Sequence, residues 1–132
     1  MNAIVKPAEA ALDVVHATLG ALLGDRLQTS QALREQHANT ATGRGTEAPD
    51  LVVYPLNTQE VSAILRCCWE NGVPVIAFGA GSSLEGQLNA PLGGVSVDMS
   101  RMNALQEVRA EDLLAVVQPG MTRKALNHEL RA

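Results

Sequence analysis

Two short apolar runs, one on each side of a single amphipathic stretch, constrain the fold of this chain most. Residues 51–54 read Leu-Val-Val-Tyr and end at a proline, which is typical of a buried strand. Asn57 is suited to cap a helix, Glu60 can complete a capping box, and Asn71-Gly72 can end it. Residues 73–78 form the second apolar run. A strand, a helix and a strand in this order predict a β-α-β unit with parallel strands.

Further elements follow this unit. Residues 95–99 alternate like a third strand, residues 113–117 indicate a fourth, and Thr122 can cap a final helix. The order predicts an α/β (α+β) fold with a small mixed sheet. The helix between the first two strands should bury one apolar face. That face consists of Val61, Ile64, Leu65 and Cys68.

The first 48 residues read as a separate helical segment. Pro7 can occupy the first position of an amphipathic helix that Gly24 ends, and a weaker helical pattern covers residues 32–38. We therefore expect two parts: an N-terminal helical segment over residues 1–48 and an α/β part over residues 49–132.

A glycine-rich loop follows the second strand directly, with the sequence Phe78-Gly-Ala-Gly-Ser-Ser-Leu-Glu-Gly-Gln87. Loops at the carboxyl ends of parallel strands are where open α/β sheets bind ligands. Glycines let backbone N–H groups surround an anion, and Ser82 and Ser83 add hydroxyl donors. The loop holds no cation, so a diphosphate that carries a large organic group suits it better than free phosphate does. The alternative is that the glycines only build turns between strands.

Two nucleotide-binding motifs are excluded by single positions in this loop. A dinucleotide fingerprint that started at Gly79 would need a glycine where Leu84 stands. A Walker A loop that started at Gly81 would need lysine where Gln87 stands, so nucleotide hydrolysis by that route is disfavoured. Asp98 follows an apolar strand, where a hydrogen-bond acceptor is more common than a metal ligand.

Charge, cysteine and histidine positions exclude other classes of function. The net charge is −4 and the ten basic residues are scattered, which argues against nucleic-acid binding. Cys67 and Cys68 are adjacent and lack metal-ligand spacing, so we expect two free thiols, a reducing compartment and no metal. His16, His37 and His128 are expected to be exposed. The polar N-terminus and the lack of a stretch of about 20 apolar residues predict a soluble, cytoplasmic protein without a transmembrane segment.

Four segments together resemble one family over residues 49–132. They read PDLVVYPLNTQEVSAIL, PVIAFGAGSSLEGQ, GGVSVDMSRMNALQEV and AVVQPGMTRKALNHEL. Their order and their sequences resemble the first lobe of the PCMH-type FAD-binding domain of vanillyl-alcohol oxidase relatives. Within that family the chain is most similar to cytochrome-linked D-lactate dehydrogenases and glycolate oxidase flavoprotein subunits.

The resemblance implies FAD as cofactor and a role for particular residues. Gly79, Ala80, Gly81, Ser82 and Ser83 match the loop that holds the FAD diphosphate. Phe78 and Gly86 flank that loop, and Pro119 and Gly120 match a segment that passes close to the flavin. Some relatives bond the flavin covalently through a histidine, but Ser82 stands at that position here. The resemblance therefore implies non-covalent FAD.

Family members continue with a second FAD-binding lobe and a substrate-binding cap, so this sequence resembles an N-terminal fragment of a longer enzyme. The longer enzyme is expected to oxidise a 2-hydroxy acid such as D-lactate or glycolate and to pass electrons to an unknown acceptor. It could be peripheral to the inner membrane. We assign no catalytic residue in this chain, and we expect the fragment alone to be inactive and to self-associate through an exposed face. The alternative is a non-catalytic α/β module that binds a nucleotide or a partner protein.

Overall fold

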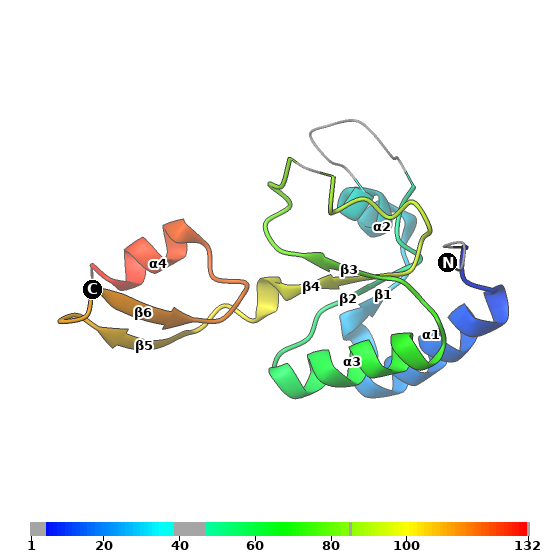
Figure 1. Ribbon diagram of the computed structural model, residues 1–132, viewed down its shortest axis with the longest axis horizontal. Helices are drawn as coiled ribbons and strands as arrows, with labels where there is room; N and C mark the ends of the chain where they lie inside the picture. The colour runs from blue at the N-terminus through cyan, green and yellow to red at the C-terminus, as the bar shows by residue number, and fades with distance from the viewer. Residues whose placement is uncertain (1–4, 39–46, 85, 132) are drawn as a thin grey trace.

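The computed structural model describes residues 5–38, 47–84 and 86–131. Their helices and strands form a four-stranded sheet with three helices, followed by a two-stranded sheet with one helix (Figure 1). The helices are α1 (Glu9–Leu23), α2 (Gln31–Ala38), α3 (Thr58–Glu70) and α4 (Arg123–Glu129), with short 3-10 turns η1 (Gly24–Arg26) and η2 (Met99–Arg101). The strands are β1 (Leu27–Gln28), β2 (Leu51–Val53), β3 (Val75–Phe78), β4 (Val95–Asp98), β5 (Leu105–Arg109) and β6 (Leu114–Val117).

The larger sheet is mixed and has the strand order β1-β2-β4-β3. Strands β2 and β3 each pair in parallel with β4, and β1 pairs antiparallel with β2. The prediction of a small mixed sheet with a parallel β-α-β unit is therefore confirmed, with β4 inserted between the two strands that α3 connects. The third strand predicted over residues 95–99 is confirmed as β4, and all four of its residues are buried. A central strand that is covered on both faces buries every side chain.

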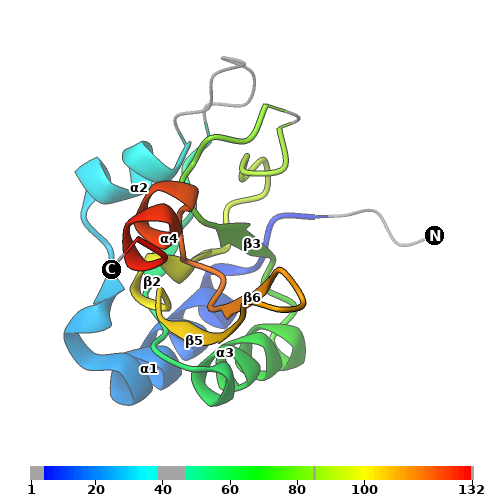
Figure 2. The ribbon, with the colours of Figure 1, turned by 90° about the vertical axis from the view of Figure 1, so that its left-hand side faces the viewer.

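Helices α1 and α3 lie side by side on one face of this sheet, while α2 and the loop after β3 lie on the other (Figures 1 and 2). The face that α1 and α3 cover holds the core. Its buried residues are Val15, Leu19, Leu23, Leu51, Val53, Ile64, Cys67, Cys68, Val73, Val95 and Val97. Leu65 was predicted to face this core but is 46% exposed, and Cys67 is buried in its place. Both cysteines are free, as predicted.

The N-terminal segment is built into the same sheet and core. Strand β1 escaped sequence prediction because it has only two residues. Arg26, just before β1, forms a two-pronged ion pair with Glu60 on α3, at 2.6 and 2.8 Å, and donates to the carbonyl of Tyr54 at 3.1 Å. These bonds fix the start of β1 against both β2 and α3.

The helix ends agree with local sequence signals except at two places. The side chain of Asn57 accepts the backbone N–H of Glu60 at 2.9 Å, and Gly24 follows the last residue of α1, as predicted. Helix α1 begins at Glu9 with Ala8 as its N-cap, so Pro7 precedes the helix and is not its first residue. The carboxylate of Glu60 accepts the N–H of Leu56 at 2.8 Å and does not return to Asn57.

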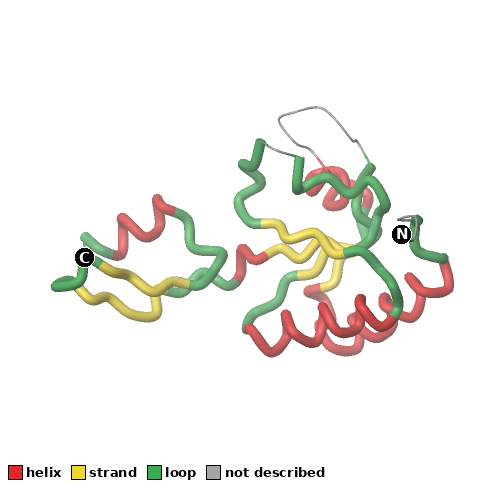
Figure 3. The backbone as a smooth tube through the Cα atoms, in the orientation of Figure 1, coloured by secondary structure: helices red, strands yellow, loops and turns green. Residues whose placement is uncertain are grey.

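The two-stranded sheet and α4 extend away from the rest of the molecule and are joined to it through η2 (Figures 1 and 3). We call the described part of residues 103–131 the arm and the described residues before it the body. Strands β5 and β6 pair antiparallel with an irregularity between Leu105 and Glu107. The sequence correctly predicted β6 and the Thr122 cap of α4, but β5 was missed. The hydroxyl of Thr122 accepts the backbone N–H of Ala125. Within the described ranges, no helix is long and apolar enough to cross a membrane.

Candidate functional site

The glycine-rich loop leaves the carboxyl end of β3 on the face of the sheet that carries α2 (Figure 1). Gly79, Ala80 and Ser82 are exposed, whereas Gly81, Ser83 and Gly86 are half-buried. Gly81 and Gly86 have φ angles of 68° and 82°, which is the left-handed region that favours glycine. The sequence therefore places glycine where the backbone needs it.

The loop offers unused hydrogen-bond donors. Among described residues, no backbone hydrogen bond uses an N–H of residues 80–84. A Cβ built at Gly79 would meet no atom within 4 Å, so space is open beside the first glycine. Open N–H groups, two serine hydroxyls and free space form a cradle for an anion. The residues present therefore fit the diphosphate of a dinucleotide cofactor.

Phe78 supports the loop from below. A Cβ built at Gly81 would lie 2.8 Å from Cζ of the Phe78 ring, so the loop folds directly over that ring. Phe78 is the register partner of Asp98 on β4, which places both side chains on the same face of the sheet. The aromatic ring and the carboxylate thus lie side by side beneath the loop.

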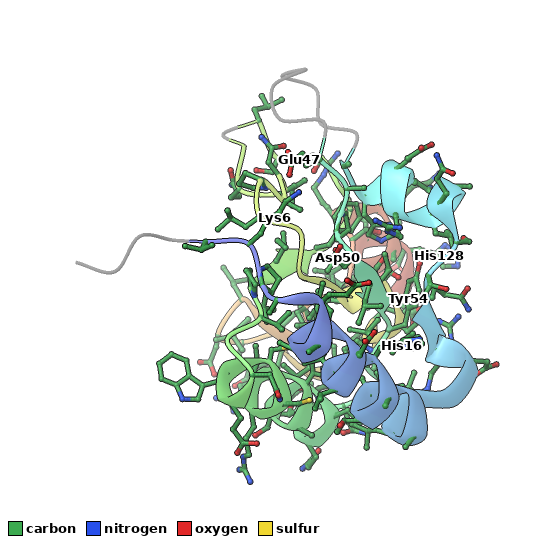
Figure 4. The ribbon with its side chains drawn as sticks, turned by 90° about the vertical axis from the view of Figure 1, so that its right-hand side faces the viewer. Lys6, His16, Glu47, Asp50, Tyr54 and His128 are labelled. Atoms are coloured by element: carbon green, nitrogen blue, oxygen red, sulfur yellow. The ribbon has the colours of Figure 1, made fainter. Side chains whose placement is uncertain are left out.

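The connection from the glycine-rich loop to β4 is fixed at its far end by Asp50, which sequence analysis did not single out. Its carboxylate accepts the N–H of Gly94 at 2.6 Å, and its own N–H donates to the carbonyl of Gly94 at 2.8 Å. Asp50 precedes β2 and Tyr54 follows it; both are labelled in Figure 4. The connection between β3 and β4, which contains the glycine-rich loop, is therefore anchored to β3 at its start and to the entry of β2 at its end.

His37 packs against Phe78 from α2. The two ring centroids are 4.3 Å apart with an interplanar angle of 45°. His37 was predicted to be exposed, but only 4% of its surface is exposed, whereas His16 and His128 are exposed as predicted. The prediction failed because an eight-residue polar helix gives little sign of which side it buries.

Both ring nitrogens of His37 face hydrogen-bond acceptors. Nδ1 lies 2.8 Å from the carbonyl oxygen of Leu33, and Nε2 lies 2.9 Å from a carboxylate oxygen of Asp98. Because neither partner can donate when Asp98 is ionised, the imidazole must donate from both nitrogens and carry a positive charge. Below the raised pKa of His37, the two side chains therefore form a buried ion pair, and they are 3% and 8% exposed.

The pKa directions of the two groups agree with this assignment. Burial lowers the pKa of His37, but its bonds to Asp98 and to the Leu33 carbonyl outweigh burial and raise it above 6.5. Burial raises the pKa of Asp98, but the bonds from His37 and from Ser100 outweigh it and bring the pKa below 3.8. The backbone N–H of Ser100 donates to the second carboxylate oxygen at 2.8 Å. Asp98 is thus a hydrogen-bond acceptor at a strand end, as expected.

Pro119 and Gly120 lie at the same end of the sheet as the loop. Pro119 is exposed, and the N–H of Gly120 donates to the carbonyl of Met102 at 2.8 Å. A Cβ at Gly120 would overlap the carbonyl oxygen of Met99, so only glycine lets these backbones approach. Among described residues, no hydrogen bond joins residues 119–120 to residues 79–83. Within these ranges there is also no cluster of side chains that could hold a metal ion.

Comparison with known proteins identifies the family of the chain. The FAD binding domain family matches residues 49–132, so the chain belongs to that family, and FAD is the cofactor that this domain binds. The chain is 37% identical over 123 residues to a probable mitochondrial D-lactate dehydrogenase from Danio rerio, and the match covers 92% of the chain and 25% of the relative. It is 36% identical over 97 residues to glycolate oxidase subunit GlcD from Bacillus subtilis (strain 168), with 74% of the chain and 21% of the relative covered.

Solved structures agree on the fold. The structure of 4-ethylphenol oxidase from Gulosibacter chungangensis superposes with a TM-score of 0.84 at 24% identity, covering 96% of this chain and 26% of that protein. The chain thus has the fold of a PCMH-type FAD-binding domain and spans a fifth to a quarter of the curated relatives described above.

Proposed function

We propose that this chain is the first lobe of the FAD-binding domain of a flavin-dependent oxidoreductase that oxidises a 2-hydroxy acid such as D-lactate or glycolate. The observation that carries the proposal is the loop at the end of β3, with open N–H groups and two serine hydroxyls. The relatives named as a D-lactate dehydrogenase and a glycolate oxidase subunit support the substrate class.

In this proposal the chain's own residues hold and orient the cofactor. The N–H groups of residues 79–83 and the hydroxyls of Ser82 and Ser83 bind the diphosphate, with Phe78 and Gly86 setting the two sides of the loop. Pro119 and Gly120 border the flavin. Bound FAD would supply the redox chemistry for oxidation of a 2-hydroxy acid to a 2-oxo acid, in which the acid loses two electrons and two protons. An acceptor outside this chain takes those electrons onward.

Three further elements complete the proposal. FAD is held without a covalent bond, because Ser82 occupies the position where some relatives carry the linking histidine. The protein acts in the cytoplasm or at the inner membrane surface. The 132-residue chain alone is inactive and self-associates through exposed apolar side chains.

The first experiment is an absorbance scan of the natural protein that carries this sequence, before and after D-lactate or glycolate is added. We expect flavin bands that bleach with substrate, and flavin that is released on denaturation. A colourless protein that takes up no added FAD would contradict the proposal and favour a non-catalytic nucleotide- or partner-binding module.

A matched pair of glycine variants tests the loop itself. Gly81→Ala puts a methyl group against the Phe78 ring at a φ of 68°, so we expect FAD affinity to fall by about tenfold or more. Gly20→Ala is the control, because a Cβ at this α1 position meets nothing within 4 Å. Flavin fluorescence titration of the apoprotein measures both, and equal affinities would argue against the loop as the binding site.

A further inference from the structure

Three layers stack on one face of the sheet beneath the glycine-rich loop. The backbone of Gly81 lies over the Phe78 ring, and the Phe78 ring lies against the imidazole of His37. The imidazole is in turn fixed by Asp98 and by the Leu33 carbonyl. Tyr54 adds an edge contact to His37, with centroids 6.3 Å apart. The layers join a helix of the N-terminal segment to a loop some 40 residues further along the chain.

The orientation of the imidazole depends on both of its hydrogen bonds. With two N–H groups and two acceptors on opposite sides, the charged ring has one orientation in which each donor is satisfied. A neutral ring has a single N–H and must give up one of these bonds. The partner left behind would be the buried Asp98 carboxylate or the part-buried Leu33 carbonyl, and loss of the bond to the buried carboxylate is costly. Loss of the proton therefore loosens the surface on which Phe78 rests.

We propose that His37 is a positioning residue, which acts through Phe78 to hold the first turn of the glycine-rich loop in the shape that binds the FAD diphosphate. The inference rests on the proposed function of the loop. A loop that is already ordered loses less conformational freedom when it binds, so affinity is higher. His37 touches no part of the cofactor in this proposal.

Apart from Asp98, the charged side chains near His37 interact with groups other than His37. Among described residues, Asp98 and Tyr54 contact His37, Arg34 and Glu35 share its helix, and Arg101 lies beyond Tyr54. Arg101 lies over the Tyr54 ring at 4.9 Å, and Arg34 donates to the Pro49 carbonyl at 2.6 Å. Glu35 accepts from Gln31 on the exposed side of α2. Asp98 is therefore the acidic group that bonds to His37 within the described ranges.

The test measures FAD affinity of the natural protein as a function of pH, together with the protonation of His37. Nitrogen-15 chemical shifts of the imidazole report the charge directly. We expect the FAD dissociation constant to rise by about tenfold as His37 loses its proton, with the same midpoint in both measurements. In His37→Gln the affinity should be lower at every pH and this step should be absent.

His16→Gln is the matched control, because His16 is exposed on α1 at the opposite face of the sheet (Figure 4). It should retain the affinity and the pH step of the unmodified protein. Phe78→Leu should weaken FAD binding while the nitrogen-15 shifts still report a charged His37. This variant keeps the ion pair and removes only the ring that links it to the loop.

The outcomes separate this inference from the proposed function. If the unmodified protein binds FAD but its affinity stays flat while His37 titrates, the inference is overturned and the FAD site stands. A pH step that persists in His37→Gln would also overturn it. If the unmodified protein binds no FAD at any pH, the proposed function fails instead. The pH measurement on unmodified protein needs no variant, so a poorly folding His37→Gln would not block the test.

Discussion

The body and the arm both contain large apolar side chains, but only the body buries them fully. In the body, eleven side chains form a buried core between the sheet and helices α1 and α3. In the arm, no described residue of β5, β6 or α4 is buried, and four of its large apolar side chains are exposed. They are Val108, Leu113, Leu114 and Leu130, between 44% and 95% exposed. The body therefore holds its own stabilisation, whereas a two-stranded hairpin alone is marginal in water.

The largest expected effect concerns the buried ion pair of the body. Asp98→Ala leaves a buried charge on His37 without its partner and should lower the free energy of unfolding by about 3–5 kcal/mol. Urea denaturation measures the change. His16→Gln, on the surface of the same body, should alter stability by less than about 0.5 kcal/mol. Equal, small losses in both variants would mean that the pair is not desolvated.

The same pair predicts the sign of the pH dependence. The pKa of His37 is raised above 6.5, so its contribution to stability is complete below pH 6.5 and is lost as pH rises through the raised value. The pKa of Asp98 is lowered below 3.8, so its contribution is complete above pH 3.8 and is lost as pH falls through the lowered value. Asp98→Ala removes the bond that raises the pKa of His37, while burial and the Leu33 carbonyl still act on it in opposite directions. The stability that the unmodified protein gains as pH falls toward 6.5 should therefore be smaller in that variant.

A second comparison sets one apolar side chain of the body against one of the arm. Ile64 is fully buried on α3, so Ile64→Ala should cost about 3 kcal/mol of unfolding free energy. Leu114 is 44% exposed on β6, so Leu114→Ala should cost under about 1 kcal/mol. Chemical denaturation followed by circular dichroism measures both. If Leu114→Ala proved as costly as Ile64→Ala, the arm would be packed against a surface that covers it.

The smallest effect belongs to the turn between β5 and β6. Leu113 has a φ of 53°, in the left-handed region, and its side chain is 95% exposed. Leu113→Gly relieves this backbone conformation, so we expect the arm to gain about 1 kcal/mol. Amide hydrogen exchange should slow in β5 and β6 and stay unchanged in β2 and β4. Uniform slowing in all four strands would instead show that arm and body open together.

Most of the correct sequence predictions came from patterns among residues that are close in the sequence. Helix α3, its Asn57 cap, the parallel strands and the glycine loop were readable because each depends on neighbouring residues. Strand β5 was missed because its apolar residues, Leu105 and Val108, are three positions apart, which breaks strand alternation. The irregularity between Leu105 and Glu107 restores the pairing in the folded chain.

The part of the site that sequence analysis missed depends on distant contacts. His37 and Asp98 are separated by 61 positions, and neither lies in a motif that requires the other. Their pairing follows from the fact that α2 packs on the face of the sheet where β4 ends. A buried strand that ends in aspartate, with an unassigned histidine in a polar helix, was the available signal. It becomes informative only once the strand order is known.

The reactivity of the adjacent cysteines can report how often the body opens. Burial raises the pKa of the Cys67 thiol, and burial together with the neighbouring thiol raises the pKa of Cys68 to about 12. Since the thiolate is the reactive form, the fully buried Cys68 sulfur is protected while α1 stays packed on α3. The rate at which a thiol reagent labels Cys68 therefore reports how often these two helices separate. It does so regardless of how the arm moves, and without an introduced cysteine.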